Sequence, residues 1–436
     1  MRPVRFLLIV LSLFWCGSDA RGQTPRLPNL LTGISMSPDS APAASGDNML
    51  TKQQVIGLAL RKSPRLKALE HEMRAIGYGA RQAKAYPNPT VSAEIEDWGR
   101  RTAGGPSQTT FGIEQTIPLW GKRRRAFEAV DARKLAVEAA WQAEALDIYA
   151  RASSLFAALL GGQEKLIQAA KRLALARETE QAVAIKMREG AVPESEVQRA
   201  TASRSLAQID SLSAASEIKS ALTELAALTG SVLSGVHGNG DLTGASRLSL
   251  PDSLGVTLRA HPLVISQSAE RDARLKDALL ARALGKPDLT VSAGYRRLHD
   301  ASDNGVLFGV SIPLPIRNPN AAGIDESDAR IDAAEANLQQ VMLEMESEIR
   351  TLAVAWERRS AEIAMIETQT LPAIEQSLAS LDLAYRVGRQ PYMNLLDVQR
   401  TQSELQTRLI DAMVEKAQLE ARLESLLGQR IDTTER

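Results

Sequence analysis

The sequence has few of the residue types on which most enzyme and metal sites depend. Its 436 residues include one cysteine, Cys16, and four histidines that lack the paired spacing of metal ligands: His71, His237, His261 and His299. It contains no glycine-rich phosphate loop followed by Lys and Ser or Thr, and no nucleophile elbow. We therefore expect no enzyme, no cofactor and no bound metal.

The sequence also has no excess of charge of either sign, and it has few aromatic residues. Lysine plus arginine and aspartate plus glutamate both total 52, so the sequence predicts no basic surface for nucleic acid. Aromatic residues make up 4% of the chain, which is sparse for a large globular core. This composition is typical of long helices that pack through Ala and Leu.

The start of the chain has the pattern of a targeting segment. Arg2 and Arg5 precede a largely apolar run at 6–15, and Ser18-Asp19-Ala20 places small residues at the positions that a signal peptidase reads. The run is too short to cross a membrane as a helix. Residues 1–20 are therefore predicted to be a cleaved secretory signal.

Two further predictions concern Cys16, inside this segment, and the stretch that follows it. Cys16 leaves lipidation open as an alternative, although Trp15 stands where a lipoprotein needs a small residue. Residues 21–48 are rich in Pro, Ser, Ala and Gly, which predicts a disordered leader.

Proline is absent between Pro118 and Pro193, and most residues in between are strong helix formers. The run from Lys122 to Glu189 therefore predicts one helix about 100 Å long. Gly190 fits a left-handed C-terminal cap, and Pro193 suits the first turn of a following helix. The run is thus predicted to be one arm of a very long helical hairpin.

A second copy of this hairpin is expected about 198 residues later. Gly388 and Pro391 have the spacing of the Gly190 turn, and Thr-Val-Ser-Ala at 90–93 recurs at 290–293. Together with other matches in the same order, these pairs predict a tandem duplication. The predicted boundaries are 49–236 for the first repeat, 251–428 for the second and 429–436 for a C-terminal tail.

Each repeat also contains a pair of predicted strands. Apolar and polar residues alternate at 91–96 and 111–117 in the first repeat, and at 289–297 and 306–314 in the second. Four strands of about ten residues are long enough to cross a bilayer when tilted.

Four strands cannot close a barrel, because closure needs at least about eight and an open edge in lipid leaves backbone groups unpaired. A dimer supplies eight strands and a trimer twelve, and only the larger number leaves a clear lumen. The predicted fold class is mainly α, with tandemly duplicated helical hairpins and a membrane β-barrel portion. The alternative is a helical rod capped by soluble hairpins, as in a periplasmic coiled-coil scaffold or adaptor.

Several motifs point to one family. They are the duplicated halves, the segment FGIEQTIPLWGKRRR at 111–125, and the Gly388 turn followed by Asn-Leu-Leu-Asp at 394–397. With these motifs the sequence resembles the TolC-like outer-membrane factor family over residues 49–428. Pro-Leu-Trp-Gly-Lys-Arg at 118–123, together with Leu371-Pro372, resembles the CzcC-like branch of heavy-metal cation efflux systems.

The resemblance implies a homotrimer in the outer membrane of a Gram-negative bacterium, with a twelve-stranded β-barrel in lipid. Its trimeric α-barrel would reach about 100 Å into the periplasm. The implied function is the outer-membrane channel of a tripartite efflux pump, a passive exit duct for heavy-metal cations. A duct for drug efflux or type I protein secretion stays open as an alternative.

Partners follow from the same resemblance. The hairpin tips would dock to a periplasmic adaptor (membrane fusion) protein and an inner-membrane resistance-nodulation-division pump. The tip residues are Gly190, Pro193, Gly388 and Pro391.

The family's gate is carried over position by position. Its acid-lined constriction falls on Asp397 and Asn394, so one ring of three carboxylates would remain. Its tyrosine before the tip glycine falls on Tyr385, the acidic partner on Glu196 and the gate arginine on Gln390. Without the family, these would be ordinary solvated residues near a helix turn.

A basic run follows the second strand. Lys122, Arg123 and Arg124 are predicted to reach the membrane interface or to contact anionic headgroups. Trp120 fits an interfacial aromatic belt, and Trp98 fits either this belt or a surface loop.

Overall fold

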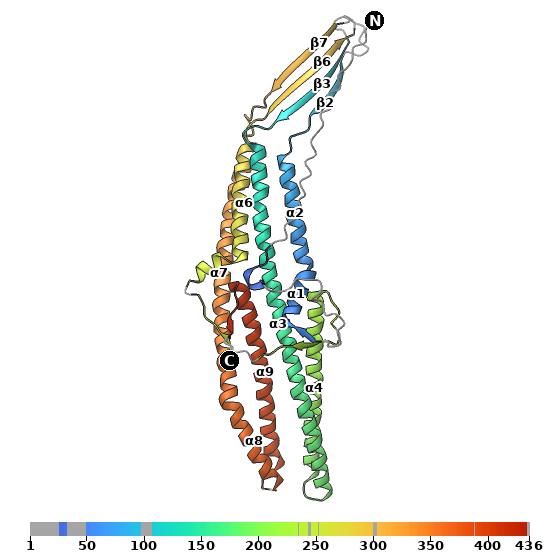
Figure 1. Ribbon diagram of the computed structural model, residues 1–436, viewed down its shortest axis with the longest axis vertical. Helices are drawn as coiled ribbons and strands as arrows, with labels where there is room; N and C mark the ends of the chain where they lie inside the picture. Colours follow the sequence, from blue (N-terminus) through green and yellow to red (C-terminus); the bar gives the residue numbers. More distant parts are fainter. Residues whose placement is uncertain are drawn as a thin grey trace.

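The computed structural model describes residues 26–32, 49–96, 107–233, 235–242, 246–251, 253–299, 303–387 and 389–433. These residues form an elongated rod of helices with a four-stranded sheet at one end (Figure 1). The predicted signal peptide, Cys16, Trp98 and Gly388 lie outside the described residues.

Helix α3 forms one arm of the first hairpin. It spans Lys122–Arg188, 67 residues without a break, as the proline-free run predicts. Helix α4 (Glu194–Thr229) returns along one half of it, while α1 (Lys52–Lys62) and α2 (Pro64–Lys84) pack on the other half. Helix α4 and the segment made of α1 and α2 therefore lie end to end along the whole of α3 (Figure 1).

The second hairpin has the same plan with one irregularity. Its helices are α6 (Pro262–Leu284), α7 (Ala321–Met365), α8 (Leu371–Arg386) and α9 (Tyr392–Leu427). Helix α7 passes into α8 through a π-helical turn at Ile366–Thr370. Pro372 in the first turn of α8 explains this turn, because proline has no N–H to donate and its ring needs room in the turn before it.

The helices form a single layer in which α3, an arm of the first hairpin, also contacts helices of the second. Next to the sheet the order is α2, α3, α6, α7, and at the far end it is α4, α3, α9, α8 (Figure 1). Among the described residues, every helix is too short or too polar to serve as a transmembrane helix.

The sheet contains both predicted strand pairs. Its antiparallel order is β2-β3-β6-β7, with strands at Thr90–Glu96, Gln108–Ile117, Leu289–Leu298 and Asp303–Ser311. Strand β7 lies about three residues earlier than predicted. It ends before Pro313, which cannot donate to a strand ladder.

One face of the sheet is apolar and uncovered. Val91, Phe308 and Val310 are 75%, 83% and 69% exposed. The register places Ala93, Phe111 and Tyr295 opposite one another on this face, as the alternation predicts. Within the described chain β2 and β7 each pair on one side only, so both edges of the sheet can accept further strands.

A belt of short elements lies around the middle of the rod. Strands β1 (Met49–Thr51) and β4 (His237–Asn239) pair in parallel, β5 (Ser246–Arg247) pairs with β8 (Asp432–Thr433), and helix α5 (Leu254–Arg259) packs on α7. Ile431, in the predicted tail, is 8% exposed, and its N–H donates to Glu424 Oε1 at 3.1 Å. The start of the tail is therefore part of the folded belt.

Residues 26–32 also belong to this belt, which corrects part of the predicted disordered leader. They include a 3₁₀ turn at Asn29–Leu31, in which Leu30 and Leu31 are 4% and 0% exposed. Both leucines pack in a cluster with Trp141 and Leu225. The average composition of the leader hides this pair of leucines, whose burial between helices orders the stretch.

Helix α3 approaches its neighbours most closely at two adjacent glycines. A Cβ on Gly161 would lie 2.2 Å from Val414 Cγ2 of α9, and one on Gly162 would lie 3.0 Å from Ile218 Cγ1 of α4. Gly77 of α2 has nothing within 4 Å of its Cβ position.

We predict opposite effects of the same substitution at two of these helical glycines. Gly77→Ala should stabilise the protein by up to about 1 kcal/mol through helix propensity. Gly161→Ala should destabilise it, because overpacking against the stiff Val414 costs about 1–3 kcal/mol, more than propensity returns. The midpoints of thermal unfolding measure both, and equal shifts of the two variants would contradict the close approach of α3 and α9.

Candidate functional site

The turn between α3 and α4 is a tight tip with a left-handed glycine. Gly190 has φ +74°, its N–H donates to the Met187 carbonyl at 3.0 Å, and the Ala191 N–H donates to the Lys186 carbonyl at 2.9 Å. This pair of bonds is a Schellman motif, which satisfies the last carbonyls of α3 and reverses the chain. The predicted left-handed cap at Gly190 is present.

The turn between α8 and α9 shares this pattern. The Arg389 N–H donates to the Ala384 carbonyl at 2.9 Å, the equivalent of the bond made by Ala191. Gly388, which the sequence aligns with Gly190, lies outside the described residues.

Each tip proline directly precedes the helix that follows it. Pro193 and Pro391 are the N-caps of α4 and α9, with φ −74° and −71°. Their carbonyls accept the first bonds of the new helices, from Glu196 N–H at 3.0 Å and Asn394 N–H at 3.2 Å. The fixed φ of proline therefore still sets the direction in which α4 and α9 start.

Tyr392 occupies the centre of an apolar cluster next to the two tips. It is 2% exposed and packs with Val183, Ala200 and Leu395. These residues come from α3, α4 and α9, so the cluster joins the first hairpin to the second. We call it the tip cluster.

The predicted gate residues Tyr385 and Glu196 lie at the tip cluster. The rings of Tyr385 and Tyr392 have centroids 5.7 Å apart, and Lys186 Nζ lies 4.2 Å from the centroid of the Tyr385 ring. Among the described residues, neither the Tyr385 hydroxyl nor Glu196 Oε2 has a hydrogen-bond partner, although both atoms are buried. A donor and an acceptor are thus both unsatisfied in one small region.

Burial raises the pKa of Tyr392 to about 12 from its ordinary value of 10.0, and the neighbouring Tyr385 and Glu196 add to this shift. All three effects disfavour a negative phenolate inside the cluster. Tyr392 therefore contributes as a neutral phenol that fills the space between hairpins.

The other predicted gate residues lie on a different face of α9. Asp397 and Asn394 are both exposed, three positions apart and therefore on one side of the helix, while Tyr392 and Leu395 are buried on another. Asn394 Nδ2 donates to Gln390 Oε1 at 2.8 Å. The structure thus groups Asn394, Gln390 and Asp397 at the surface, apart from the tip cluster.

Sequence reasoning missed Tyr392 and Lys186. Tyr392 had one usable signal, because it follows Pro391 at the position where the first repeat has Glu194 after Pro193. Lys186 had none, since a basic residue in the last turn of a helix is an ordinary feature.

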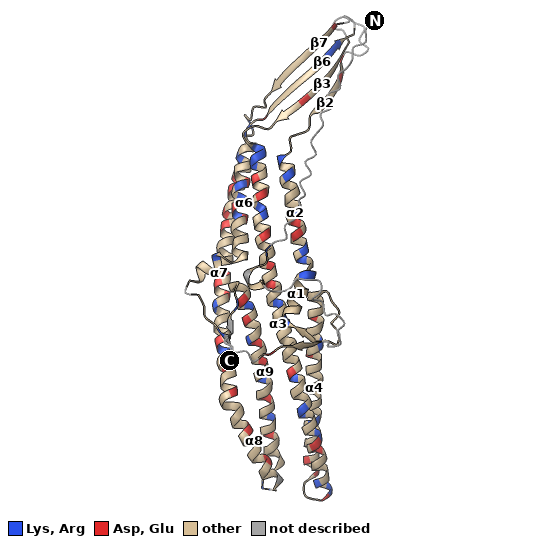
Figure 2. Cartoon of the chain, viewed as in Figure 1, with Lys and Arg blue, Asp and Glu red and all other residues tan. Residues whose placement is uncertain are grey.

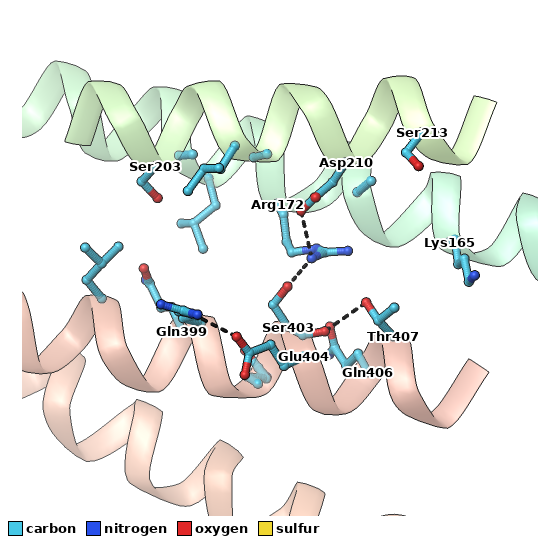
Figure 3. A pocket seen from close by; sticks show the side chains of 18 of the residues that line it. Lys165, Arg172, Ser203, Asp210, Ser213, Gln399, Ser403, Glu404, Gln406 and Thr407 are labelled. Carbon is cyan, nitrogen blue, oxygen red and sulfur yellow. Dashed lines mark hydrogen bonds and ion pairs between the residues drawn. The ribbon is translucent and has the colours of Figure 1, made fainter. Parts of the chain in front are cut away.

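A polar groove of about 950 Å³ lies between the first hairpin and α9. Figure 3 shows Arg172 of α3 between Asp210 of α4, at 3.3 Å, and Ser403 of α9. Lys165 contacts Glu217 at 2.9 Å and Asp411 at 2.7 Å. Partial burial lowers the pKa of Lys165, but its bonds to Asp411 and Glu217 outweigh this and raise it overall. These cations of α3 therefore tie α4 and α9 together.

At the sheet end, the predicted interface residues divide into two kinds. Trp120 is 53% exposed and the Arg124 side chain is 74% exposed. Arg123 is half-buried, donates to the Lys84 carbonyl, and lies with Cζ 3.4 Å from the centroid of the Tyr86 ring.

The structure corrects the prediction that Lys122 reaches the membrane interface. It is 8% exposed, and its Nζ lies 2.8 Å from Asp288 Oδ1. The same oxygen accepts the Leu119 N–H at 3.1 Å. The left-handed Gly121 between them turns the chain, so Lys122 faces the start of β6 and locks this corner instead of reaching the interface.

Metal-ligating side chains do not converge in the part of the chain that the structure describes: it has no group of three or more His, Cys, Asp and Glu residues placed to hold an ion.

The model of the family described as "Outer membrane efflux protein" matches residues 55–231 and 254–429, once in each repeat. The chain belongs to the outer membrane efflux protein family. Channels of this family are trimeric components of tripartite pumps. The chain is therefore a channel and not an enzyme, and its apolar sheet face lies in the outer membrane while its helices extend into the periplasm.

Two sequence relatives and one solved structure illustrate the family. The chain is 27% identical over 402 residues to the cobalt-zinc-cadmium resistance protein CzcC of Cupriavidus metallidurans, which covers 91% of this chain and 94% of CzcC. It is 30% identical over 295 residues to the nickel-cobalt-cadmium resistance protein NccC of Alcaligenes xylosoxydans xylosoxydans, or 66% of this chain and 65% of NccC. The crystal structure of CusC has a TM-score of 0.75 at 18% identity, covering 93% of this chain and 98% of CusC.

We predict that the tip cluster of this outer membrane efflux protein weakens at high pH. Because the pKa of Tyr392 is raised in the folded protein, its stabilisation is complete below pH 10.0 and is lost as the pH rises towards about 12. Tyr392→Phe should remove this part of the pH dependence. Ultraviolet absorbance of the phenolate and thermal unfolding at each pH measure the effect.

The exposed Tyr78, on α2, is the control. If Tyr78→Phe rather than Tyr392→Phe removed the late-ionising phenol, the assignment to Tyr392 would be wrong.

Proposed function

We propose that this channel is the exit duct for heavy-metal cations in its tripartite pump. The observation that carries the proposal is the identity of 27% to CzcC over 94% of the length of that protein. CzcC and NccC are resistance proteins for cobalt, zinc and cadmium and for nickel, cobalt and cadmium, respectively. Their shared chemistry is a divalent cation.

A passive duct for such ions needs a favourable electrostatic potential more than a set of ligands. Tight coordination would trap an ion that must leave, whereas a ring of carboxylates attracts cations and releases them.

Asp397 is the acid that we assign to this ring. It is exposed on α9, two turns after the tip. Arg400, one turn further along α9, forms an ion pair with Glu404 at 2.8 Å. Its charge is therefore shared between two acids, and Asp397 is not fully neutralised. Three copies of Asp397 in a trimer would form one ring of negative charge.

Tyr385 and Glu196 are the residues that we assign to closing the duct. Their buried, unsatisfied atoms are a donor on α8 and an acceptor on α4. A small movement, or one bridging water, would let the Tyr385 hydroxyl donate to Glu196 and hold the second hairpin to the first. Asn394 and Gln390, hydrogen-bonded to each other, would line the exposed side of the same constriction.

The two tips are the surfaces that we assign to the periplasmic adaptor and, through it, to the inner-membrane resistance-nodulation-division pump. Gly190, Pro193 and Pro391 are all exposed at the end of the rod opposite the sheet (Figure 1). The Schellman motif at Gly190 gives the first tip a defined shape for docking, and the Arg389 N–H bond to the Ala384 carbonyl closes the second tip in the equivalent way.

We predict that Asp397→Ala lowers the preference of the channel for cations over anions, because three carboxylates leave the ring. The reversal potential in a salt gradient, recorded from the trimer in a planar bilayer, measures this preference. Glu357→Ala is the matched control, since it removes an exposed acid from the shaft of α7. Unchanged reversal potentials in Asp397→Ala would exclude Asp397 from the narrowest part of the duct.

We also predict which toxic compounds the channel protects against. In cells that carry the cognate adaptor and pump, loss of this chain should lower the tolerated concentrations of cobalt, zinc or cadmium ions, and the wild-type chain should restore them. Tolerance of a lipophilic drug should not change. If drug tolerance fell and metal tolerance did not, a drug-efflux duct would replace the proposal.

A further inference from the structure

We propose that the protein binds anionic phospholipid of the periplasmic leaflet through the junction where its sheet meets its helices. We define the junction as residues 84–87, 118–125, 284–288 and 312–320, which connect α2, α3, α6 and α7 to their strands. The inference rests on charge, depth and backbone strain, and is independent of the cargo of the channel.

The junction carries positive charge that the chain does not neutralise. Figure 2 shows Lys and Arg gathered where the helices meet the sheet. Lys286 and Arg317 are exposed and form no ion pair with any described residue, and Arg124 approaches Glu128 only to 3.7 Å. The acid of the junction, Asp288, is already paired with Lys122.

The neighbouring acids of α7 change this balance little. Glu326 pairs with Arg330 at 2.6 Å and Asp328 with Arg282 at 3.0 Å. Asp325 is the one acid of residues 321–330 without an ion pair in the described chain. A chain that is neutral overall therefore has a local excess of cations at one level.

The apolar face of the sheet places this level at the edge of the hydrocarbon. After β7 the exposed apolar series continues through Ile312, Leu314 and Ile316, which are 50%, 73% and 82% exposed, and Arg317 follows directly. Basic residues that flank an apolar band lie among lipid headgroups. The phosphodiester of an anionic lipid is the complementary group at that depth.

Trp120 supplies an independent observation. It adopts a left-handed backbone conformation with φ +59°, which is strained for a bulky residue. Asn320, at φ +63° before α7, is the counterpart of Gly121, at φ +70° before α3, because each is the N-cap of its helix. Among the described residues, the second repeat has no left-handed counterpart of Trp120. Glycine or asparagine would adopt this conformation with less strain, so an exposed indole is present here despite the strain.

The indole is aimed and fixed by the junction. Trp120 Nε1 donates to the Pro287 carbonyl at 2.9 Å, and Lys286 Nζ lies 4.8 Å from the centroid of the Trp120 ring. Tryptophan prefers the headgroup level of a bilayer. Trp120 and Lys286 thus present an aromatic face and an ammonium group together, a pairing suited to one lipid headgroup and the start of its acyl chains.

Lipid binding to the detergent-purified, delipidated trimer tests the proposal. Native mass spectrometry compares phosphatidylglycerol with phosphatidylethanolamine of the same acyl chains. The wild type should retain phosphatidylglycerol preferentially. Arg124→Gln combined with Lys286→Gln should lower that retention by about thirtyfold, since each cation near an anionic surface strengthens binding about fivefold.

A control variant separates a built site from general charge. Lys219→Gln combined with Arg350→Gln removes the same two charges from exposed positions on α4 and α7, away from the junction. This variant should keep the wild-type preference. Equal loss in both double variants, or equal binding of the two lipids by the wild type, would overturn the proposal.

Quenching of tryptophan fluorescence by brominated phosphatidylglycerol tests the role of Trp120. Trp120→Asn, which places a residue type that tolerates the left-handed conformation in this turn, should preserve the trimer and lose the quenched component. Unchanged quenching would remove Trp120 from the site. Inorganic phosphate should not displace the lipid, and displacement would show a site for soluble anions instead.

Discussion

The unbroken backbone ladder of α3 is the constraint on which the rest of the structure depends. Over 67 residues no proline interrupts it, and its rise of about 1.5 Å per residue sets the distance from the sheet to the tips. Both hairpins pack on it, closely enough at Gly161 and Gly162 that a methyl group would collide. The cations Lys165 and Arg172 then connect it to α4 and α9 at once. Helix α3 is therefore the element to which both α4 and the second hairpin are attached.

The two repeats share one plan and differ at a few informative positions. Pro372 introduces a π-helical turn into the second hairpin that the continuous α3 lacks. Tyr392 follows the second tip where the first has Glu194, and it fills the space between the hairpins. Trp120 adopts a left-handed conformation next to Gly121, whereas the second repeat has a single left-handed residue, Asn320, before α7. The two copies of the plan therefore differ in packing and in backbone conformation at these positions.

The fold of one chain is incomplete by its own physical chemistry. The sheet has two open edges and a bare apolar face, which lipid tolerates only when neighbouring strands close the ring. At the opposite end of the rod, the Tyr385 hydroxyl and Glu196 Oε2 lack hydrogen-bond partners within the described chain, which is a smaller deficit. A closed barrel removes the first deficit permanently. We propose that the second is satisfied in one arrangement of the hairpins and released in another.

The sequence alone determined the features that depend on residues near one another along the chain. The helix of α3, the alternation in the strands and the Gly190 turn are local patterns, read from periodicity and spacing. The duplication is the recurrence of such local patterns about 198 residues later. Tertiary packing decided the rest. Lys122 is buried because Asp288, 166 positions later, lies against it, and Leu31 is buried in a cluster with Trp141 and Leu225, 110 and 194 positions later. The neighbours of Tyr392 come from four helices. Such contacts join residues that no local pattern relates, so only the folded chain could show them.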